Sequence, residues 1–171
     1  MVFLLLAALA PGFNSVAAPL PTAAAPLPAN LAWGWPLAGK PRVVRAFDPP
    51  AQPWLSGHRG VDLLAAQGSA VVSPTEGVVS FSGVVADRPV LSLAVAGGLR
   101  LNLEPVRSEL KAGDAVIRGQ PLGVLEGPTH CRDPAWGGSC LHWGVRRGED
   151  YLNPLQFVLD LRPSVLLPPR G

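Results

Sequence analysis

The sequence predicts an all-β domain, a sandwich or barrel of antiparallel strands with a short helix near its C-terminal end. Three observations predict this fold class. Short β-branched and apolar runs alternate with turn signals about every 8–12 residues. The 171 residues include 19 glycines and 20 prolines, and only 15% of them are charged, which is typical of a chain rich in turns. No convincing helical periodicity is found before residue 153.

Strands are predicted where short apolar or alternating runs are bounded by turn residues. Gly97-Gly98 separates two of these runs and is typical of a hairpin turn that needs positive φ. The predicted strands are residues 42–46, 60–63, 70–72, 77–85, 90–95, 99–103, 115–117, 121–125 and 141–146.

A short helix is predicted to follow the last strand. Asn153 fits the N-cap position and Pro154 the first helical position. The apolar side of this helix would consist of Leu155, Val158 and Leu159.

The N-terminal segment is typical of a secretory signal peptide over residues 1–17. An apolar core precedes small residues at 15–17, and the core is too short to span a bilayer. No Lys or Arg precedes Lys40, so the true translation start is left open. Residues 18–32 form a Pro/Ala linker, 33–160 the predicted domain and 161–171 a C-terminal tail. A leader of this kind predicts a secreted, extracellular protein.

The charge pattern gives no support for nucleic-acid binding. The formal net charge is +2, and no basic stripe runs along any segment. The positive charge comes almost entirely from arginine, since Lys40 and Lys111 are the lysines of the chain.

A carrier of lipoate or biotin is one alternative function. Residues 71–79 and 111–123 resemble the two halves of a lipoyl-type hairpin. A carrier needs a lysine at the tip of a hairpin, whereas Lys111 opens a loop and Lys40 precedes the domain. The pattern therefore supports the fold more than the carrier function.

Cys131 and Cys140 predict a disulfide. Two close cysteines in a secreted chain favour a bond over reduced thiols. Thiolates on a metal are the other alternative, but the spacing matches no known zinc finger. A bond here would stabilise the fold by roughly 2–3 kcal/mol on the loop-entropy model.

His58 and Asp62 are spaced so that a strand would place both on one face, with Gly60 between them. Gly60 would leave room there for an ion or a substrate. His142 lies on a separate apolar run, and two imidazoles with one carboxylate are a common ligand set for catalytic zinc. The spacing alone is equally compatible with two unrelated surface histidines and a loop aspartate.

The segments Gly-His-Arg-Gly-Val-Asp at 57–62 and Leu-His-Trp-Gly-Val-Arg at 141–146 resemble motifs of the lysostaphin-type, LytM-like zinc metallopeptidases, which cut peptidoglycan. The resemblance covers residues 33–160. It implies an antiparallel β-sheet/barrel-sandwich hybrid with lipoyl-like hairpins, and Zn²⁺ held by His58, Asp62 and His142. It also implies peptides of bacterial peptidoglycan as partners and a location at the cell wall. The family's His-x-His motif begins here with Cys140 instead of histidine.

Two further residues are candidates for catalytic proton transfer. The resemblance aligns Glu104 with a family histidine, and a glutamate can act as general base beside a metal; the alternative is a solvated carboxylate at a strand end. His130 is a candidate because the predicted disulfide would tether its loop close to His142; the alternative is an exposed loop histidine. Cys140 cannot act as a base within a disulfide.

Three neighbouring residues are given structural roles. Arg59 alternates with the ligands and is predicted to be a solvated charge on the opposite face. Trp143 alternates with His142 and is predicted to lie in the core. Asp114 is predicted to be a turn residue.

The sequence supports a monomeric, secreted zinc metalloendopeptidase that hydrolyses stem peptides or cross-bridges of peptidoglycan. The main alternative is a degenerate, non-catalytic module that binds zinc or wall peptides and activates another hydrolase. The loss of both auxiliary histidines favours this alternative, and the intact ligand set opposes it. An unrelated β-domain is a third reading, which retention of zinc would exclude.

Overall fold

The computed structural model describes residues 33–131 and 139–158 of the chain. The expected signal peptide (1–17), linker (18–32) and tail (161–171) lie outside the described residues, as does Leu159. Within the described ranges, no helix has the length and apolar character needed to cross a membrane.

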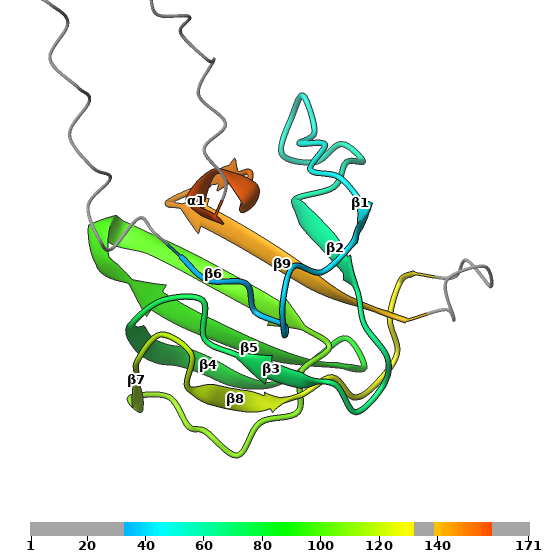
Figure 1. The fold of residues 1–171 in the computed structure, drawn as a ribbon. Helices are drawn as coiled ribbons and strands as arrows, with labels where there is room; N and C mark the ends of the chain where they lie inside the picture. The colour runs from blue at the N-terminus through cyan, green and yellow to red at the C-terminus, as the bar shows by residue number, and fades with distance from the viewer. Residues whose placement is uncertain (1–32, 132–138, 159–171) are drawn as a thin grey trace, which may run out of the picture.

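The described residues form the all-β fold that the sequence predicts (Figure 1). Every predicted strand is present with slightly different ends, and one short strand, β10, was not predicted. The strands are β1 (Val43–Arg45), β2 (Gly60–Leu64), β3 (Ala70–Val72), β4 (Gly77–Val85), β5 (Arg88–Val95), β6 (Leu99–Glu104), β7 (Ala115–Val116), β8 (Pro121–Val124), β9 (Cys140–Arg147) and β10 (Asp150–Leu152). A 3₁₀ turn, η2 (Ala96–Gly98), and one helix, α1 (Leu155–Val158), complete the described elements.

Most strands belong to one antiparallel sheet with the order β1-β2-β9-β6-β5-β4-β7, and β10 pairs with β9. β3 and β8 form a separate two-stranded sheet, which lies below β5 and β4 in the view of Figure 1. β9 comes late in the chain yet lies between β2 and β6. This topology brings the first sequence motif directly beside the second.

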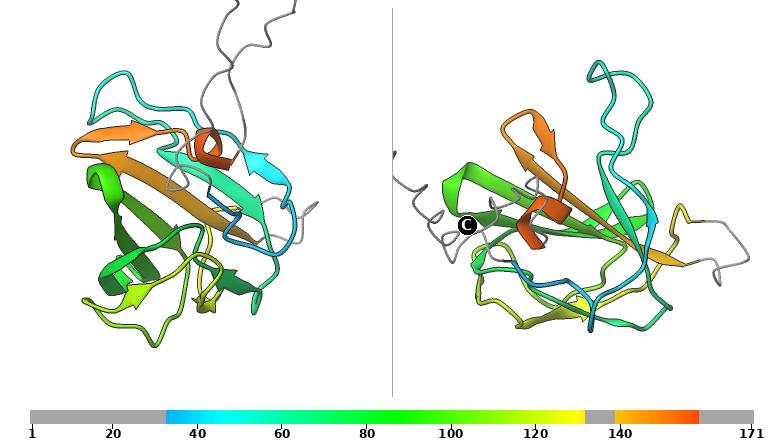
Figure 2. Two further views of the ribbon diagram at one scale, coloured as in Figure 1. Left: turned by 60° about the vertical axis from the view of Figure 1, so that its left-hand side comes forward. Right: turned by 45° about the horizontal axis from the view of Figure 1, so that its top comes forward.

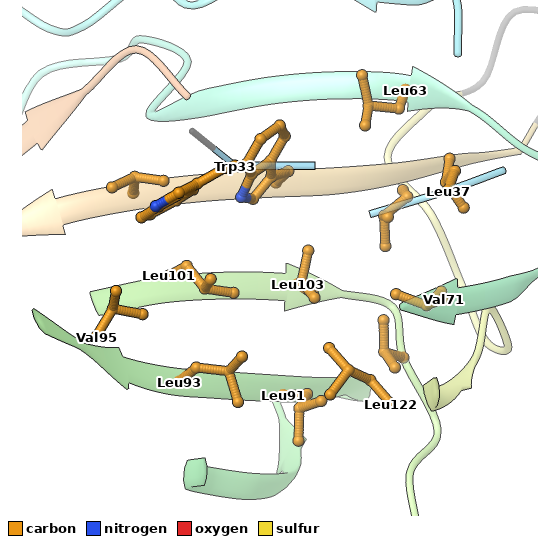
Figure 3. Close-up of a cluster of buried hydrophobic side chains, with 14 of the residues drawn as sticks. Trp33, Leu37, Leu63, Val71, Leu91, Leu93, Val95, Leu101, Leu103 and Leu122 are labelled. Atoms are coloured by element: carbon orange, nitrogen blue, oxygen red, sulfur yellow. The ribbon is translucent and has the colours of Figure 1, made fainter. Parts of the chain in front are cut away.

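The hydrophobic core lies on one face of the large sheet. Alternate residues of β5 and β6 point into it, as period-two side-chain alternation requires (Figure 3). Each fully buried leucine contributes about 1.5–3 kcal/mol relative to an exposed one. The buried hydrophobic residues labelled in Figure 3 are Trp33, Leu37, Leu63, Val71, Leu91, Leu93, Val95, Leu101, Leu103 and Leu122.

The turns form where the sequence predicts them. Gly97 and Gly98 have φ of 74° and 70°, the left-handed region that favours glycine. The Asp114 carboxylate accepts a hydrogen bond from the Lys111 backbone N–H (2.8 Å), which closes the turn that precedes β7.

The short helix α1 is capped as predicted. The Asn153 side-chain oxygen accepts a hydrogen bond from the Leu155 N–H (3.1 Å). The predicted apolar side was incomplete: Leu155 and Val158 are partly buried, but Phe157 is the residue that enters the core. Its ring stacks on Trp33 with centroids 4.2 Å apart, so the two ends of the described domain pack together.

Candidate metal centre

The face of the large sheet opposite the core carries the candidate site. Along β9, Trp143 points into the core and His142 points to the other face. His142 pairs in register with Asp62 on β2 and with Glu104 on β6. These three residues therefore form one row across three adjacent strands, with side chains on the same face.

His58 lies just before β2 and is fixed by backbone and side-chain contacts. Its backbone forms a two-way bridge with Asp48, with N···O distances of 2.6 and 3.0 Å. Its Nδ1 lies 2.6 Å from the carbonyl oxygen of Ala46. Since a carbonyl can only accept, Nδ1 carries the proton, and in the neutral ring Nε2 keeps a free lone pair directed at Asp62.

Three potential ligand atoms converge at this point. His58 Nε2 lies 3.0 Å from Asp62 Oδ1 and 3.1 Å from His142 Nδ1. His142 Nδ1 lies 2.8 Å from the same carboxylate oxygen. Tetrahedral zinc with bonds of about 2.0–2.2 Å would set its ligand atoms about 3.3–3.6 Å apart, so the observed triangle would need to widen by only a few tenths of an ångström. Lone pairs facing each other at 3.0 Å repel unless a proton or a metal ion lies between them, and this donor set fits zinc.

Asp62 has no exposed surface in the structure. Burial alone raises the pKa of its carboxyl group. The close contacts with the imidazoles of His130, His142 and His58 outweigh that effect and hold the pKa of Asp62 well below its usual range. The group is therefore a carboxylate, the form in which it can bind a metal.

Gly60 has a different role from the one predicted. A Cβ atom at this position would collide with the Trp143 carbonyl oxygen and would lie 2.7 Å from the His142 ring. The missing side chain thus makes room for the His142 imidazole and the β9 backbone, rather than for an ion or a substrate. By contrast, a Cβ at Gly144 would meet nothing nearer than 3.4 Å.

The Cys131–Cys140 disulfide is present, with its Cα atoms 5.8 Å apart. The prediction of a bond is confirmed, and the alternative of metal-bound thiolates does not apply to oxidised sulfurs. The bond joins the residue after His130 to the first residue of β9, two positions before His142.

His130 lies at the site rather than out on its loop. Its Nε2 is 2.8 Å from Asp62 Oδ2, the carboxylate oxygen that the other two histidines do not contact. The ligand atoms of His58, Asp62, His130 and His142 all lie within 4.8 Å of one another. His130 is 30% exposed, whereas His142 is 13% exposed, so His130 is the histidine most open to solvent.

Glu104 lies beside His142 in a groove of about 490 Å³ that opens from the site. The nearest cation is Arg88, with an N···O distance of 3.8 Å, a long and half-exposed pair. The Glu104 side chain is 24% exposed and lines the groove. The structure thus places Glu104 and His130 near the three predicted ligands.

The predictions for the neighbouring residues had mixed outcomes. Trp143 is fully buried in the core, as predicted. Arg59, predicted to be a solvated charge on the opposite face, instead lines the groove together with His142. Its guanidinium donates to the Pro53 and Leu55 carbonyls (2.6 and 3.3 Å). Alternation failed here because Arg59 precedes the regular part of β2.

Two parts of the site carried no usable sequence signal. The Ala46 carbonyl orients His58, but a backbone group leaves no trace in the residue type. Tyr151 also lines the groove, from the unpredicted strand β10, and its ring centroid lies 5.5 Å from the Arg59 guanidinium. Figure 2 shows the β9–β10 hairpin and the β1–β2 loop projecting on the same side of the molecule.

Comparison with known proteins agrees with this geometry. The sequence profile of peptidase family M23 matches residues 56–154, which include both motifs. Uncharacterized proteins of Mycobacterium tuberculosis and Mycobacterium bovis are 42% identical over 127 residues, 71% of this chain and 49% of theirs. The chain thus spans about half the length of these curated relatives.

Solved structures show the same fold. A zinc-containing peptidase from Vibrio cholerae superposes with a TM-score of 0.59 at 18% identity, over 72% of this chain and 39% of that one. Csd3 of Helicobacter pylori superposes with a TM-score of 0.57 at 26% identity, over 80% and 39% of the two chains. The chain belongs to peptidase family M23 and has the fold of the LytM-like peptidases.

Proposed function

We propose that this protein is a secreted zinc metalloendopeptidase that hydrolyses stem peptides or cross-bridges of bacterial peptidoglycan. The observation that carries the proposal is the convergence of His58, Asp62 and His142 at the end of an open groove. Two imidazoles and a carboxylate form the three-ligand set of catalytic zinc, which leaves one position for water or substrate.

His58 Nε2, Asp62 Oδ1 and His142 Nδ1 would hold the metal. A bound zinc ion would supply Lewis acidity, lowering the pKa of its water and polarising the scissile carbonyl. The Ala46 carbonyl fixes the His58 ring for this role, and Gly60 allows the His142 ring to approach.

Glu104 and His130 would share the proton-transfer and oxyanion roles. Glu104 faces the groove and would take a proton from the attacking water, then pass it to the leaving amine. His130 Nε2 lies 2.8 Å from Asp62 Oδ2, and its ring would turn to donate the Nε2–H to the developing oxyanion instead. Both roles belong to histidines in related enzymes by the family resemblance, so this chain would perform the reaction with a substituted pair.

The wider organisation is part of the proposal. Residues 33–160 would be the peptidase domain, with 1–17 as signal peptide, 18–32 as linker and 161–171 as tail. The Cys131–Cys140 bond supports secretion, because disulfides persist in oxidising compartments. A monomer is expected.

A non-catalytic module is the second candidate, and His130 is the observation that favours it. If His130 Nε2 moved from Asp62 Oδ2 onto the metal, four ligands would close the coordination sphere, as in structural zinc sites. Such a protein would bind zinc or wall peptides and activate another hydrolase.

Mass spectrometry of peptidoglycan digested by the zinc-loaded protein distinguishes the two candidates. The endopeptidase releases fragments with new peptide amino termini and intact glycan chains. His142→Ala, which removes a ligand, should release none. A wild-type protein that retains zinc but leaves every wall preparation uncut would be the non-catalytic module.

A further inference from the structure

A second set of polar residues lies in the same groove, farther along the sheet from the metal site. Arg100 on β6 pairs in register with Arg146 on β9, and Arg146 pairs with Tyr151 on β10. These residues form a row on the same face as the row of Asp62, His142 and Glu104, because four residues separate them along β6 and β9. Arg59, Arg100 and Tyr151 all line the groove.

The arrangement of the arginines is unfavourable in an empty groove. Like charges directly opposite each other on antiparallel strands destabilise the pair, since their Cβ atoms lie about 4.5–5.5 Å apart. Among the residues that the structure describes, no carboxylate forms an ion pair with Arg59, Arg100 or Arg146. Arg146 donates one long bond to the Gly148 carbonyl (3.5 Å).

Arg59 and Arg100 differ in how they are held. Arg59 is fixed by two backbone carbonyls and by the Tyr151 ring. Arg100 is exposed, and no hydrogen bond or ion pair engages it within the described part of the chain. Its guanidinium is therefore free to form the paired, charge-assisted hydrogen bonds that carboxylates accept.

We propose that Arg100, with Arg146 and Arg59 beside it, binds a free carboxylate of the wall peptide and so selects acidic substrates. This inference rests on the proposed function. Between the arginine row and the metal row lies a neutral row, in which Ser92 donates to Asn102 Oδ1 (2.7 Å) opposite Gly144. This neutral floor would accommodate the intervening peptide backbone.

The strand register sets the distance of the carboxylate from the bond that is cut. Four residues along β9 from His142 to Arg146 span about 13 Å. An extended peptide covers that length in about four residues, so the recognised acid group should lie about that far from the scissile amide. A peptide carboxylate fits better than a phosphate-bearing wall polymer, because the arginines continue the groove that starts at the metal site.

The test measures binding without turnover, so it does not depend on the success of the proposed reaction. Each variant is made in the full chain on a Glu104→Gln background. The probes are a cross-linked muropeptide dimer purified from peptidoglycan, and the same dimer with its carboxylates amidated by carbodiimide and ammonia. Arg147→Gln is the matched control, because Arg147 follows Arg146 but pairs with the buried Leu99 on the other face.

Arg100→Gln should weaken binding of the native dimer by about 5- to 20-fold, the range of an exposed charge-assisted contact. Amidation should weaken binding to the parent by a similar factor, and Arg100→Gln should then add nothing. Arg147→Gln should bind like the parent. Equal losses in both arginine variants, or a loss in Arg100→Gln that persists with the amidated dimer, would overturn the proposal. So would undiminished binding of the amidated dimer to the parent, or an Arg100-dependent interaction with teichoic acid alone.

Discussion

Removing the Cys131–Cys140 disulfide should affect stability and activity by separate routes. The bond closes a loop with a sequence separation of 9. The loop-entropy model gives it a contribution of roughly 2.5–3 kcal/mol to the free energy of unfolding. The Cys131→Ser/Cys140→Ser variant should therefore unfold at a lower urea concentration, and its melting temperature should fall by about 10 °C.

The effect on activity follows from the position of His130. The bond fixes the residue next to His130 to the start of β9, and His130 Nε2 lies 2.8 Å from Asp62 Oδ2. Without the bond, His130 loses that anchor and with it part of its contribution to turnover. General acid–base help is worth about 10²–10⁴-fold, so His130→Ala sets the upper limit of the loss.

The assay compares the release of new amino groups from purified peptidoglycan, well below the melting temperature of each variant. The double serine variant should lose most of what His130→Ala loses, and the triple variant should be no slower than His130→Ala alone. Zinc content should stay at the wild-type level throughout. Full activity in the double serine variant, or losses that multiply in the triple variant, would refute the idea that the bond acts through His130.

The remaining predictions concern the metal row. Gly60→Ala should destabilise the fold and reduce zinc content, because the new Cβ meets the His142 ring and the β9 backbone. Gly144→Ala is the control and should retain zinc. Thermal melts measure the stability of both variants, and elemental analysis measures their zinc content. Glu104→Gln should lower turnover by about 10²–10⁴-fold with zinc unchanged, while Arg88→Gln, which removes only a long ion pair, should change kcat by less than about threefold. Equal loss of zinc in Gly60→Ala and Gly144→Ala would contradict the role given to Gly60. Equal loss of turnover in Glu104→Gln and Arg88→Gln would contradict the role given to Glu104.

The fold could be predicted from the sequence because its strands follow simple local rules. Alternation of apolar residues places Leu101 and Leu103 in the core, and Gly97-Gly98 supplies the positive φ of a hairpin turn. β10 was missed because Asp150–Leu152 is too short and too polar to show alternation, and it forms only by pairing with β9. Phe157 was missed because its burial depends on stacking against Trp33, far away in the sequence.

The candidate site was only partly accessible to the same reasoning. The sequence predicts that His58 and Asp62 lie on one face, since both belong to one short segment. The orientation of His58 by Ala46 and the fit of Gly60 against His142 depend on contacts between distant segments. The face on which Arg59 lies was predicted wrongly because strand alternation was applied to a residue that precedes Gly60, the first residue of β2.

The most direct test of the central claim titrates zinc into the metal-stripped protein while peptide-bond cleavage in purified peptidoglycan is recorded. Cleavage should rise with added zinc and saturate at one ion per chain, and Asp62→Asn should neither bind zinc tightly nor cleave. A protein that takes up one zinc ion through His58, Asp62 and His142 but cleaves no peptide bond at saturation would contradict the claim that this centre is catalytic.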